Sequence, residues 1–454
     1  MTARWRAWLL GGCLLVLPAC TSPGKGMIAL EGATLIDGAG GPPKRDALIL
    51  IRDGHIEDVA RVNEIPVPRG AQRIQLIGKT IIPGLVDAHA RVEPWAAPQY
   101  LAWGVTSVRD FGSGGDTGTT LKKDVNLGSI LGPRVYTSGA LIDGVPATQS
   151  GATAVATDEE ARRAVDQRAV ADADYVVIAT KITPELLKGI MDEAATLHLP
   201  VAAELGKIDA LAAARAGVAT IEGLSGITQF AARNAQAIER AHDLFYAGWT
   251  AEEQAWATLD SASVARAAKA LAATRVAMVP TLAVHELWSH LDDPTRLQRP
   301  EMADVPADSA NPVRDVSTLL RRSGWKPQDF AAFRAARARE NQFVREFRAA
   351  GGIVAAGSGA GNPLLPPGTA LHEEMALLVA AGWSNVDAIT AATRRGAEVL
   401  HTDSIGVIAP GKVADLVVLA ANPADSITAV RHVAWVMTRG RIIRPDSLRA
   451  TWKR

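Results

Sequence analysis

The stretch Ile81-Ile-Pro-Gly-Leu-Val86 opens the part of the sequence in which strands and helices alternate. From here to about residue 401, short apolar segments are followed by segments whose apolar residues have helical spacing. Two of these helices have recognisable starts, because Thr157 precedes Asp-Glu-Glu and Thr183 precedes Pro-Glu. This alternation predicts parallel strands, which we expect at residues 81–86, 105–109, 134–137, 175–179, 200–204, 218–222, 276–281 and 352–356.

Parallel strands that alternate with helices in this number are typical of a (β/α)₈ barrel, so we expect an α/β fold with such a barrel over residues 81–402. The segment at about 285–350 is too long for a plain loop and predicts a helical insertion over one end of the barrel. The flanking residues 27–80 and 403–445 are rich in strands, and the first flank contains a hairpin with Asp53-Gly54 at its turn. We expect the two flanks to pair into one small β-sandwich, since each is too short to bury a core alone.

The composition is that of an ordinary globular protein. Of the 454 residues, 48% are hydrophobic and 21% are charged, with 48 basic and 48 acidic side chains. Disordered chains have fewer apolar residues and a larger net charge, so this composition excludes disorder of the whole chain. The sequence has no basic run and no interleaving of basic with aromatic residues, and we therefore expect no nucleic-acid partner.

The N-terminal residues resemble a bacterial lipoprotein signal. Arg4 and Arg6 precede an apolar stretch at residues 7–17 that is too short to span a bilayer, and Leu17-Pro-Ala-Cys20 follows it. The resemblance implies a signal peptide over residues 1–20, acylation of Cys20, and a lipid anchor in the bacterial cell envelope, on the periplasmic face of the outer membrane. An uncleaved leader with a chance cysteine is the alternative. The only other cysteine is Cys13, so we expect no disulfide in the mature chain.

Several longer motifs resemble the amidohydrolase superfamily, in its imidazolonepropionase- and prolidase-like branch. The similarity extends over nearly all of residues 27–443. The motifs are Ile82-Pro-Gly-Leu-Val-Asp-Ala-His89, Gly104-Val-Thr-Ser-Val-Arg-Asp110, Gly132-Pro-Arg-Val135, Gly411-Lys-Val-Ala-Asp-Leu-Val-Val-Leu419, Asn422-Pro423 and Val436-Met-Thr-Arg-Gly440.

The resemblance implies a divalent metal centre at the carboxyl ends of the barrel strands, where the metal turns water into hydroxide. Its expected ligands are a His-x-His pair on strand one, a carboxylated lysine on strand four, histidines on strands five and six, and an aspartate on strand eight. In this sequence only the first histidine, His89, is retained. The other positions are occupied by Arg91, Val177, Glu204, Gly223 and Gly359.

No shift of the alignment restores the missing groups. The sequence has no histidine between His198 and His242, and no aspartate between Glu340 and Val386. Lys181 is the one alternative ligand, displaced from the position of Val177 by about 13 Å of strand. Because a catalytic zinc needs three protein ligands, His89 alone cannot hold one, and we expect no metal cofactor; zinc or another divalent metal is the alternative.

Two charged groups remain where the resemblance places the metals. We expect Arg91 and Glu204 to form a partly buried ion pair, since each charge needs a partner in such a place. Glu204 and Glu222 are the candidate catalytic residues. An acid–base set of Glu222, Asp87, Asp110 and Arg109 is one interpretation, and polar groups that fix strand ends are the favoured alternative.

The remaining candidates are interpreted as structural. His285 and His290 are five residues apart, which is not the spacing of a ligand pair on a helix, and we expect both on the surface of the insertion. Ser358 has no histidine beside it in sequence. We also expect structural roles for His372-Glu373-Glu374, core positions for Trp288, Trp325 and Trp383, and a plain loop at Gly112 to Gly118.

The sequence therefore predicts an amidohydrolase-like barrel whose metal centre is degenerate. We expect a non-catalytic protein that binds a small molecule or a peptide in the barrel mouth, or an assembly element, and self-association is left open. The alternative is a hydrolase of carbon–nitrogen bonds in amides or cyclic amides, with His89 and with Glu204 or Glu222 as a base.

Overall fold

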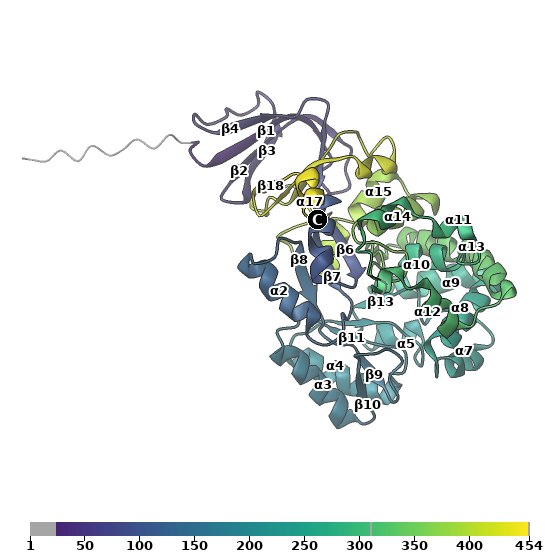
Figure 1. Ribbon diagram of the computed structural model, residues 1–454. Coiled ribbons are helices and arrows are strands. Elements are labelled where there is room, and N and C mark those ends of the chain that lie inside the picture. The colour runs from purple at the N-terminus through teal and green to yellow at the C-terminus, as the bar shows by residue number, and fades with distance from the viewer. Residues whose placement is uncertain (1–23, 309–310, 453–454) are drawn as a thin grey trace, which may run out of the picture.

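A computed structural model describes residues 24–308 and 311–452. They form a mixed α/β fold with one antiparallel-rich sheet beside two parallel sheets and their helices (Figure 1). The predicted signal peptide and Cys20 lie outside the described residues. None of the helices in the described part of the chain has the length and apolar character that a membrane span requires.

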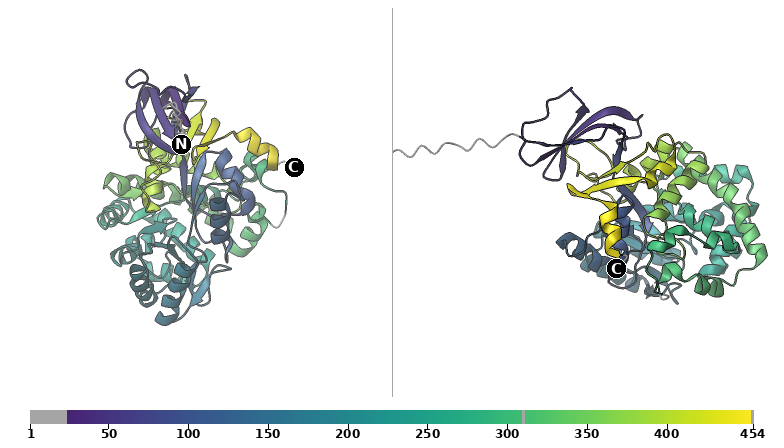
Figure 2. Two further views of the ribbon diagram at one scale, coloured as in Figure 1. Left: turned by 90° about the vertical axis from the view of Figure 1, so that its left-hand side faces the viewer. Right: turned by 45° about the horizontal axis from the view of Figure 1, so that its top comes forward.

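The two ends of the described chain share one eight-stranded sheet, in the order β18-β17-β16-β5-β1-β2-β3, with β4 beside β1. The N-terminal and C-terminal strands lie side by side in both views of Figure 2. The predicted hairpin is present, and both residues of its turn, Asp53 and Gly54, have positive φ. The strands are β1(Met27–Leu35), β2(Lys44–Arg52), β3(His55–Arg61), β4(Gln72–Gln75), β5(Thr80–Pro83), β16(Leu416–Leu419), β17(Val433–Thr438) and β18(Arg441–Ile443). Whether these strands form a two-layer sandwich, and the domain bounds given above, stay predictions.

The parallel strands form a three-stranded sheet, β6-β7-β8, and a seven-stranded sheet, β10-β9-β11-β12-β13-β14-β15. Backbone hydrogen bonds connect both edges of the three-stranded sheet to the seven-stranded sheet or to residues next to its strands. The amide of Ala88 donates to the carbonyl of Ala356 at 2.9 Å, and the amide of Asp174 donates to the carbonyl of Thr137 at 2.8 Å. The strands are β6(Leu85–Ala90), β7(Val105–Asp110), β8(Arg134–Thr137), β9(Ile142–Gly144), β10(Thr153–Val155), β11(Val176–Ile178), β12(Val201–Ala203), β13(Thr220–Glu222), β14(Ala277–Val279) and β15(Ile353–Val354).

The strand predicted at residues 81–86 is in fact divided between two sheets. The chain leaves β5 of the antiparallel-rich sheet at Pro83 and enters β6 of a parallel sheet at Leu85. A Cβ atom on Gly84, between them, would lie 2.1 Å from Oγ1 of Thr106, so only glycine fits this crossing. The short strands β9 and β10 were not predicted.

Helices cover the parallel sheets, and the longest of them, α13, packs against α8 and α9. The predicted starts are confirmed, since the hydroxyl of Thr157 accepts a hydrogen bond from the amide of Glu160 and that of Thr183 accepts one from Leu186. The helices are α1(Ala97–Ala102), α2(Thr117–Leu127), α3(Asp158–Val170), α4(Pro184–Thr196), α5(Ala210–Arg215), α6(Ile227–Ala231), α7(Ala235–Ala241), α8(Phe245–Thr258), α9(Ser261–Ala272), α10(Leu282–Trp288), α11(Pro294–Leu297), α12(Val316–Ser323), α13(Pro327–Ala349), α14(Thr369–Ala380), α15(Asn385–Ala391), α16(Arg394–Val399) and α17(Pro445–Trp452), with 3-10 helices η1(Pro94–Ala96), η2(Pro300–Asp304), η3(Pro312–Arg314) and η4(Ile427–Arg431).

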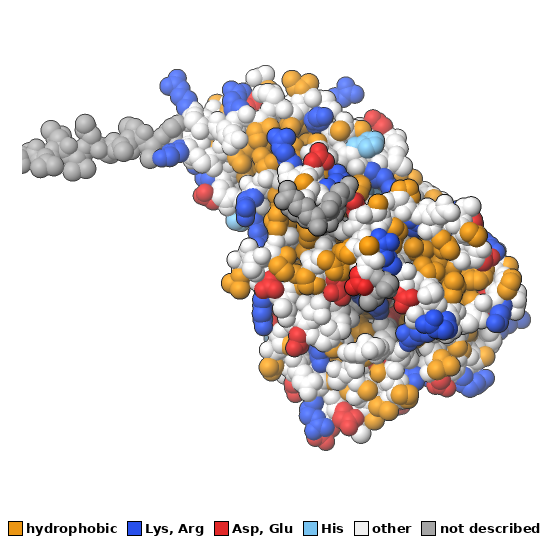
Figure 3. Space-filling view, viewed as in Figure 1, with side chains coloured by type: hydrophobic (Ala, Val, Ile, Leu, Met, Phe, Trp, Pro, Cys, Tyr) orange, Lys and Arg blue, Asp and Glu red, His pale blue; other side chains and the backbone are white. Residues whose placement is uncertain are grey.

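The predicted insertion at about 285–350 contains α11, α12, α13 and two 3-10 helices. Its helices lie beside α8 and α10 in Figure 1. On the face shown in Figure 3, basic and acidic side chains are interspersed rather than gathered into areas of one sign.

Candidate functional site

A cavity of about 340 Å³ lies beyond the carboxyl ends of the parallel strands. Three of its lining residues come directly from these strand ends: His89 near the end of β6, Glu204 just after β12 and Gly223 just after β13. Ligand sites of parallel α/β folds lie at this end of the strands. Loops and the helices α8 and α10 supply the other walls, among them Arg91, Gln149, Phe245, Tyr246, Trp249 and Trp288.

His89 is held from two sides. Its Nδ1 atom lies 2.8 Å from Oε2 of Glu222, and its ring stacks on Phe111 with 4.0 Å between the ring centres. Burial lowers the pKa of His89, although Glu222 works in the opposite direction. The imidazole is therefore fixed in orientation, with Nδ1 engaged by a carboxylate.

Glu222 is fully buried and belongs to a charge network under the cavity. Its Oε1 atom accepts hydrogen bonds from Nη1 of Arg109 at 2.8 Å and from the hydroxyl of Thr220 at 2.7 Å. Burial would raise the pKa of Glu222, but Arg109 and His89 outweigh burial and hold the pKa below its ordinary value. A carboxylate with a low pKa and several donors is a weak base, so this geometry favours the structural interpretation of Glu222.

Arg91 and Glu204 do not form the direct ion pair that we predicted. The side chain of Gln149 lies between them: Nη2 of Arg91 donates to Oε1 of Gln149 at 2.7 Å, and Nε2 of Gln149 donates to Oε2 of Glu204 at 2.9 Å. The prediction was wrong because Gln149 comes from the loop between β9 and β10, and neither strand was foreseen. Burial raises the pKa of Glu204 to about 7, with the charge of Arg91 opposing the shift.

Asp87 and Asp110 fix strand ends, as the favoured interpretation had it. Asp87 accepts hydrogen bonds from the amide of Ser358 at 2.9 Å and from its hydroxyl at 2.6 Å. Asp110 accepts hydrogen bonds from the hydroxyls of Thr137, at 2.8 Å, and Ser113. Burial raises the pKa of Asp87 to about 6, but neither aspartate nor Ser358 lines the cavity. The predicted acid–base set is therefore not brought together around one reacting centre.

The residues at the implied metal positions do not fit a metal ion. Val177 packs in a small apolar cluster with Phe111 and Leu141, and Lys181 turns away, with Nζ donating to the carbonyl of Pro146 at 2.8 Å. A Cβ atom on Gly359 would lie 2.3 Å from a methyl group of Val284. Among the described residues, the single group of three or more His, Cys, Asp and Glu side chains close enough to share an ion does not include His89.

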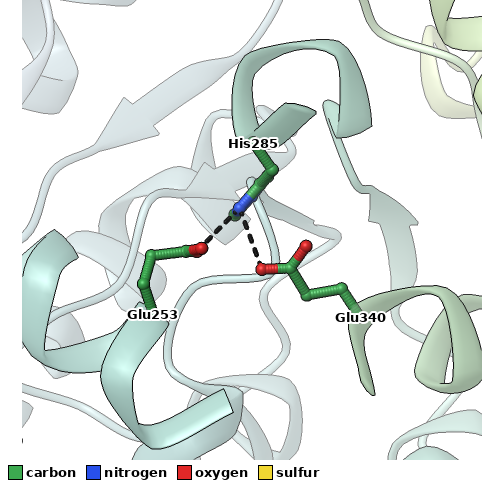
Figure 4. A group of neighbouring side chains, drawn as sticks. All are labelled: Glu253, His285 and Glu340. Carbon is green, nitrogen blue, oxygen red and sulfur yellow. Dashed lines mark hydrogen bonds and ion pairs between the residues drawn. The ribbon is translucent and has the colours of Figure 1, made fainter. Parts of the chain in front are cut away.

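His285 is not on the surface, which corrects our prediction. Its side chain is 3% exposed, and Nδ1 lies 2.8 Å from Oε1 of Glu253 and 3.3 Å from Oε1 of Glu340. The two carboxylates outweigh burial and raise the pKa of His285, while burial and the charge of Glu340 raise the pKa of Glu253. Sequence spacing could not reveal this group, because its members lie on α8, α10 and α13 (Figure 4). His290 keeps a partly exposed side chain, as expected.

A second polar group on the cavity wall had no sequence signal. Oε1 of Glu252, on α8, accepts hydrogen bonds from Nε2 of Gln229 at 2.7 Å and from the amide of Gly226 at 3.1 Å, and Nε2 of His242 lies 3.2 Å away. Glu252 and His242 both line the cavity. Their carboxylate and imidazole are held by neighbours within the fold, which makes them part of a rigid wall.

The remaining candidates have structural contacts. The ring of His372 is buried and bonds through Nε2 to the carbonyl of Trp103 at 2.9 Å, and Oε2 of Glu374 accepts a hydrogen bond from the amide of Ala283 at 2.8 Å. Trp288 belongs to the core, as expected, and it also lines the cavity. Glu373 pairs with Arg299, Trp325 packs on Trp249, Trp383 lies under Arg348, and Gly112 and Gly114 border the cavity.

Residues 80–443 match the sequence model of the amidohydrolase family. No curated protein sequence matches the chain. Among solved structures, a candidate prolidase from Bifidobacterium longum is 26% identical, with a TM-score of 0.70 and a match covering 95% of this chain and 100% of that one. A Xaa-Pro dipeptidase with methionine bound in its active site is 20% identical (TM-score 0.67; 92% and 100% covered), and the bottromycin amidohydrolase is 20% identical (TM-score 0.72; 93% and 88% covered). At their level of identity, the last two establish only the shared fold.

Proposed function

The chain belongs to the amidohydrolase family, in its prolidase-like branch, and on that basis we propose that its parallel sheets close into a (β/α)₈ barrel. We propose further that the cavity of this barrel binds a small molecule or a peptide without metal-dependent hydrolysis. The hydrogen bonds from Ala88 to Ala356 and from Asp174 to Thr137 support closure, since each joins an edge of the three-stranded sheet to a residue next to a strand of the seven-stranded sheet. The cavity then lies at the mouth of the barrel.

One observation carries the proposal: at the family's metal positions His89 is the one implied ligand retained, and the carboxylate of Glu204 is the one other group there that can bind a metal. The other positions hold a guanidinium, which donates only hydrogen bonds, and residues without a donor atom for a metal. A catalytic zinc needs three protein ligands and an open position. The residues of this chain that face the cavity can bind and orient a molecule, but they cannot hold the ion that activates water in this family.

The walls of the cavity indicate the kind of molecule that would fit. Tyr246, Trp249 and Trp288 supply apolar aromatic surface. The linked side chains of Arg91, Gln149 and Glu204 supply hydrogen-bond donors and acceptors. Apolar surface with a few placed polar groups is typical of a small-molecule site, and it suits a ligand with one apolar end and one polar end.

A hydrolase of carbon–nitrogen bonds is the second candidate, and Glu204 is the observation that favours it. Glu204 lines the cavity, and its pKa of about 7 is close to the value that suits a general base at neutral pH. In this scheme the carboxylate of Glu204 takes a proton from water as the water attacks an amide carbon, and it passes that proton to the amide nitrogen as the carbon–nitrogen bond breaks. The names of the similar structures, which include a dipeptidase and an amidohydrolase, agree with this reaction class.

Incubation with amide compounds separates the two candidates. The purified full chain is mixed with Xaa-Pro dipeptides, N-acyl amino acids and cyclic amides, and binding is followed by tryptophan fluorescence and products by mass spectrometry. We expect binding with the compound recovered intact, both in the parent protein and in Glu204→Gln. Product formed by the parent and lost in Glu204→Gln establishes the second candidate instead. Product that persists in Glu204→Gln and disappears on chelation contradicts both.

We also propose that the chain is a lipoprotein of the bacterial cell envelope, anchored through Cys20. The support is the order of Arg4, the apolar stretch at 7–17 and Cys20. Two or three acyl chains hold a protein firmly, because each buried CH₂ contributes about 0.8 kcal/mol. Labelled palmitate is expected in the parent chain and absent from Cys20→Ser. Equal labelling of the two proteins, or no labelling of the parent, rejects the anchor.

A further inference from the structure

Three helices behind the cavity bring a histidine and two glutamates together. Glu253 lies on α8, His285 on α10 and Glu340 on α13, and their side chains point toward one another (Figure 4). Nδ1 of His285 lies 2.8 Å from Oε1 of Glu253 and 3.3 Å from Oε1 of Glu340. One ligand atom from each residue lies within 4.8 Å of the others, and all three side chains are buried. We call Glu253, His285 and Glu340 the three-helix cluster.

The hydrogen bonds around the cluster leave acceptors facing one another. Nε2 of His285 lies 3.1 Å from the carbonyl oxygen of Gly223, which can only accept, so Nε2 carries a proton. Without the second proton that the two carboxylates favour on Nδ1, this nitrogen is an acceptor that faces both of them. Arg337 donates to Oε2 of Glu340, the oxygen that does not face His285.

Two of these buried acceptors also have no donor. In the described part of the chain, Oε2 of Glu253 and Oε1 of Glu340 accept no hydrogen bond, although both side chains are at least 99% buried. Oε1 of Glu340 is the atom that faces the imidazole. Leaving a buried acceptor unpaired is unfavourable, and an acceptor set that converges in this way is matched by a cation at its centre.

We propose that the three-helix cluster binds one divalent transition-metal cation, with Nδ1 of His285 and a carboxylate oxygen from each of Glu253 and Glu340 as its ligands. Ligand atoms around tetrahedral zinc lie about 3.3 Å apart, given metal–ligand distances of about 2.0–2.2 Å. The separations of 2.8 and 3.3 Å in the cluster are close to that value. Imidazole and carboxylate together suit zinc and its first-row neighbours.

The surroundings of the cluster are those of a metal site. A histidine that binds a metal usually donates its second ring N–H to a carbonyl or carboxylate, and Gly223 provides this carbonyl. Arg337 holds Glu340 by one oxygen and leaves the other for the ion. Oε2 of Glu286 lies 3.3 Å from Nε of Arg337. When the carboxylates of Glu253, Glu340 and Glu286 are ionised and His285 is neutral, these groups and the guanidinium of Arg337 carry a net charge of −2, which one divalent cation neutralises.

The position of the ion defines its role. It would join α8, α10 and α13, and through His285 it would hold the carbonyl of Gly223 at the end of β13. His285 and Gly223 both line the cavity, so the ion would fix one cavity wall. The site is separate from the family's metal positions, because His89 is not a member of the cluster.

Zinc titration of the full chain tests the proposal. The protein is treated with a chelator, dialysed, and titrated with ZnSO₄, and bound metal is measured by calorimetry and by elemental analysis. We expect one zinc per chain and a higher melting temperature with zinc. Glu253→Gln and His285→Gln should each weaken zinc binding at least 100-fold. The matched control is His89→Gln, which should bind zinc as the parent does.

The outcomes separate this inference from the proposed function. If the parent does not bind zinc, the inference is overturned. In that case hydrogen bonds, and not a metal ion, hold the three side chains of the cluster together. Zinc binding that survives Glu253→Gln also overturns it, and if that binding is lost in His89→Gln, the proposed function fails as well. Glu253→Gln keeps the size of the side chain, so it decides the question even if His285→Gln does not fold. Circular dichroism checks each variant for the fold.

Discussion

Replacement of Glu222 with alanine is expected to lower the free energy of unfolding by about 3–5 kcal/mol, because it leaves a buried charge without its partner. The guanidinium of Arg109 is 3% exposed and lies 2.8 Å from Oε1 of Glu222. The same substitution removes the partner of Nδ1 of His89. Urea unfolding, followed by the fluorescence of the tryptophans, measures the change.

An exposed ion pair provides the control for this substitution. Glu159 lies 3.1 Å from Arg163 on α3, and both side chains are mostly exposed. Glu159→Ala should change the free energy of unfolding by less than about 1 kcal/mol, since solvent screens such pairs. If Glu222→Ala unfolds at the same urea concentration as Glu159→Ala, the buried network does not stabilise the fold as described.

Replacement of Gly359 with aspartate, which restores the family's residue, is expected to destabilise the fold by about 2–4 kcal/mol through overlap and a left-handed backbone. The φ of Gly359 is +65°, and a Cβ atom there would lie 2.3 Å from Cγ2 of Val284. Val284 is short, β-branched and buried on α10, so it cannot turn aside. Thermal melting of the parent and the variant measures the loss.

Two further variants isolate the cause. Gly114→Asp introduces the same side chain at a glycine that borders the cavity, where nothing lies within 4 Å of the added Cβ, and it should melt close to the parent. Val284→Ala combined with Gly359→Asp should recover part of the loss by removing the overlapping methyl groups. If Gly359→Asp alone has the same melting temperature as the parent, this position can still accommodate an aspartate side chain.

Local signals in the sequence predicted the local structure well. Thr157 and Thr183 cap helices as expected, and Asp53-Gly54 forms the hairpin turn. These features depend on a few neighbouring residues. The division of residues 81–86 between two sheets depends on a contact between Gly84 and Thr106, more than 20 residues away, and no local pattern shows it.

The sequence could show which of the implied ligands are missing, but not the contacts of the residues at their positions. The absence of histidine between His198 and His242 is a fact of sequence, and in the structure His89 and Glu204 both line the cavity. The partners of Glu204 and of His285 were not visible in the same way. Gln149 lies 55 residues from Glu204, and Glu340 lies 55 residues from His285, so only the folded chain brings each pair together.

A zinc-edge anomalous difference map of the full chain, crystallised with excess zinc, tests the loss of the family's metal centre most directly. The account predicts no peak within coordination distance of Nε2 of His89. A well-occupied peak about 2.0–2.1 Å from that nitrogen, the distance of a zinc–imidazole bond, would contradict it.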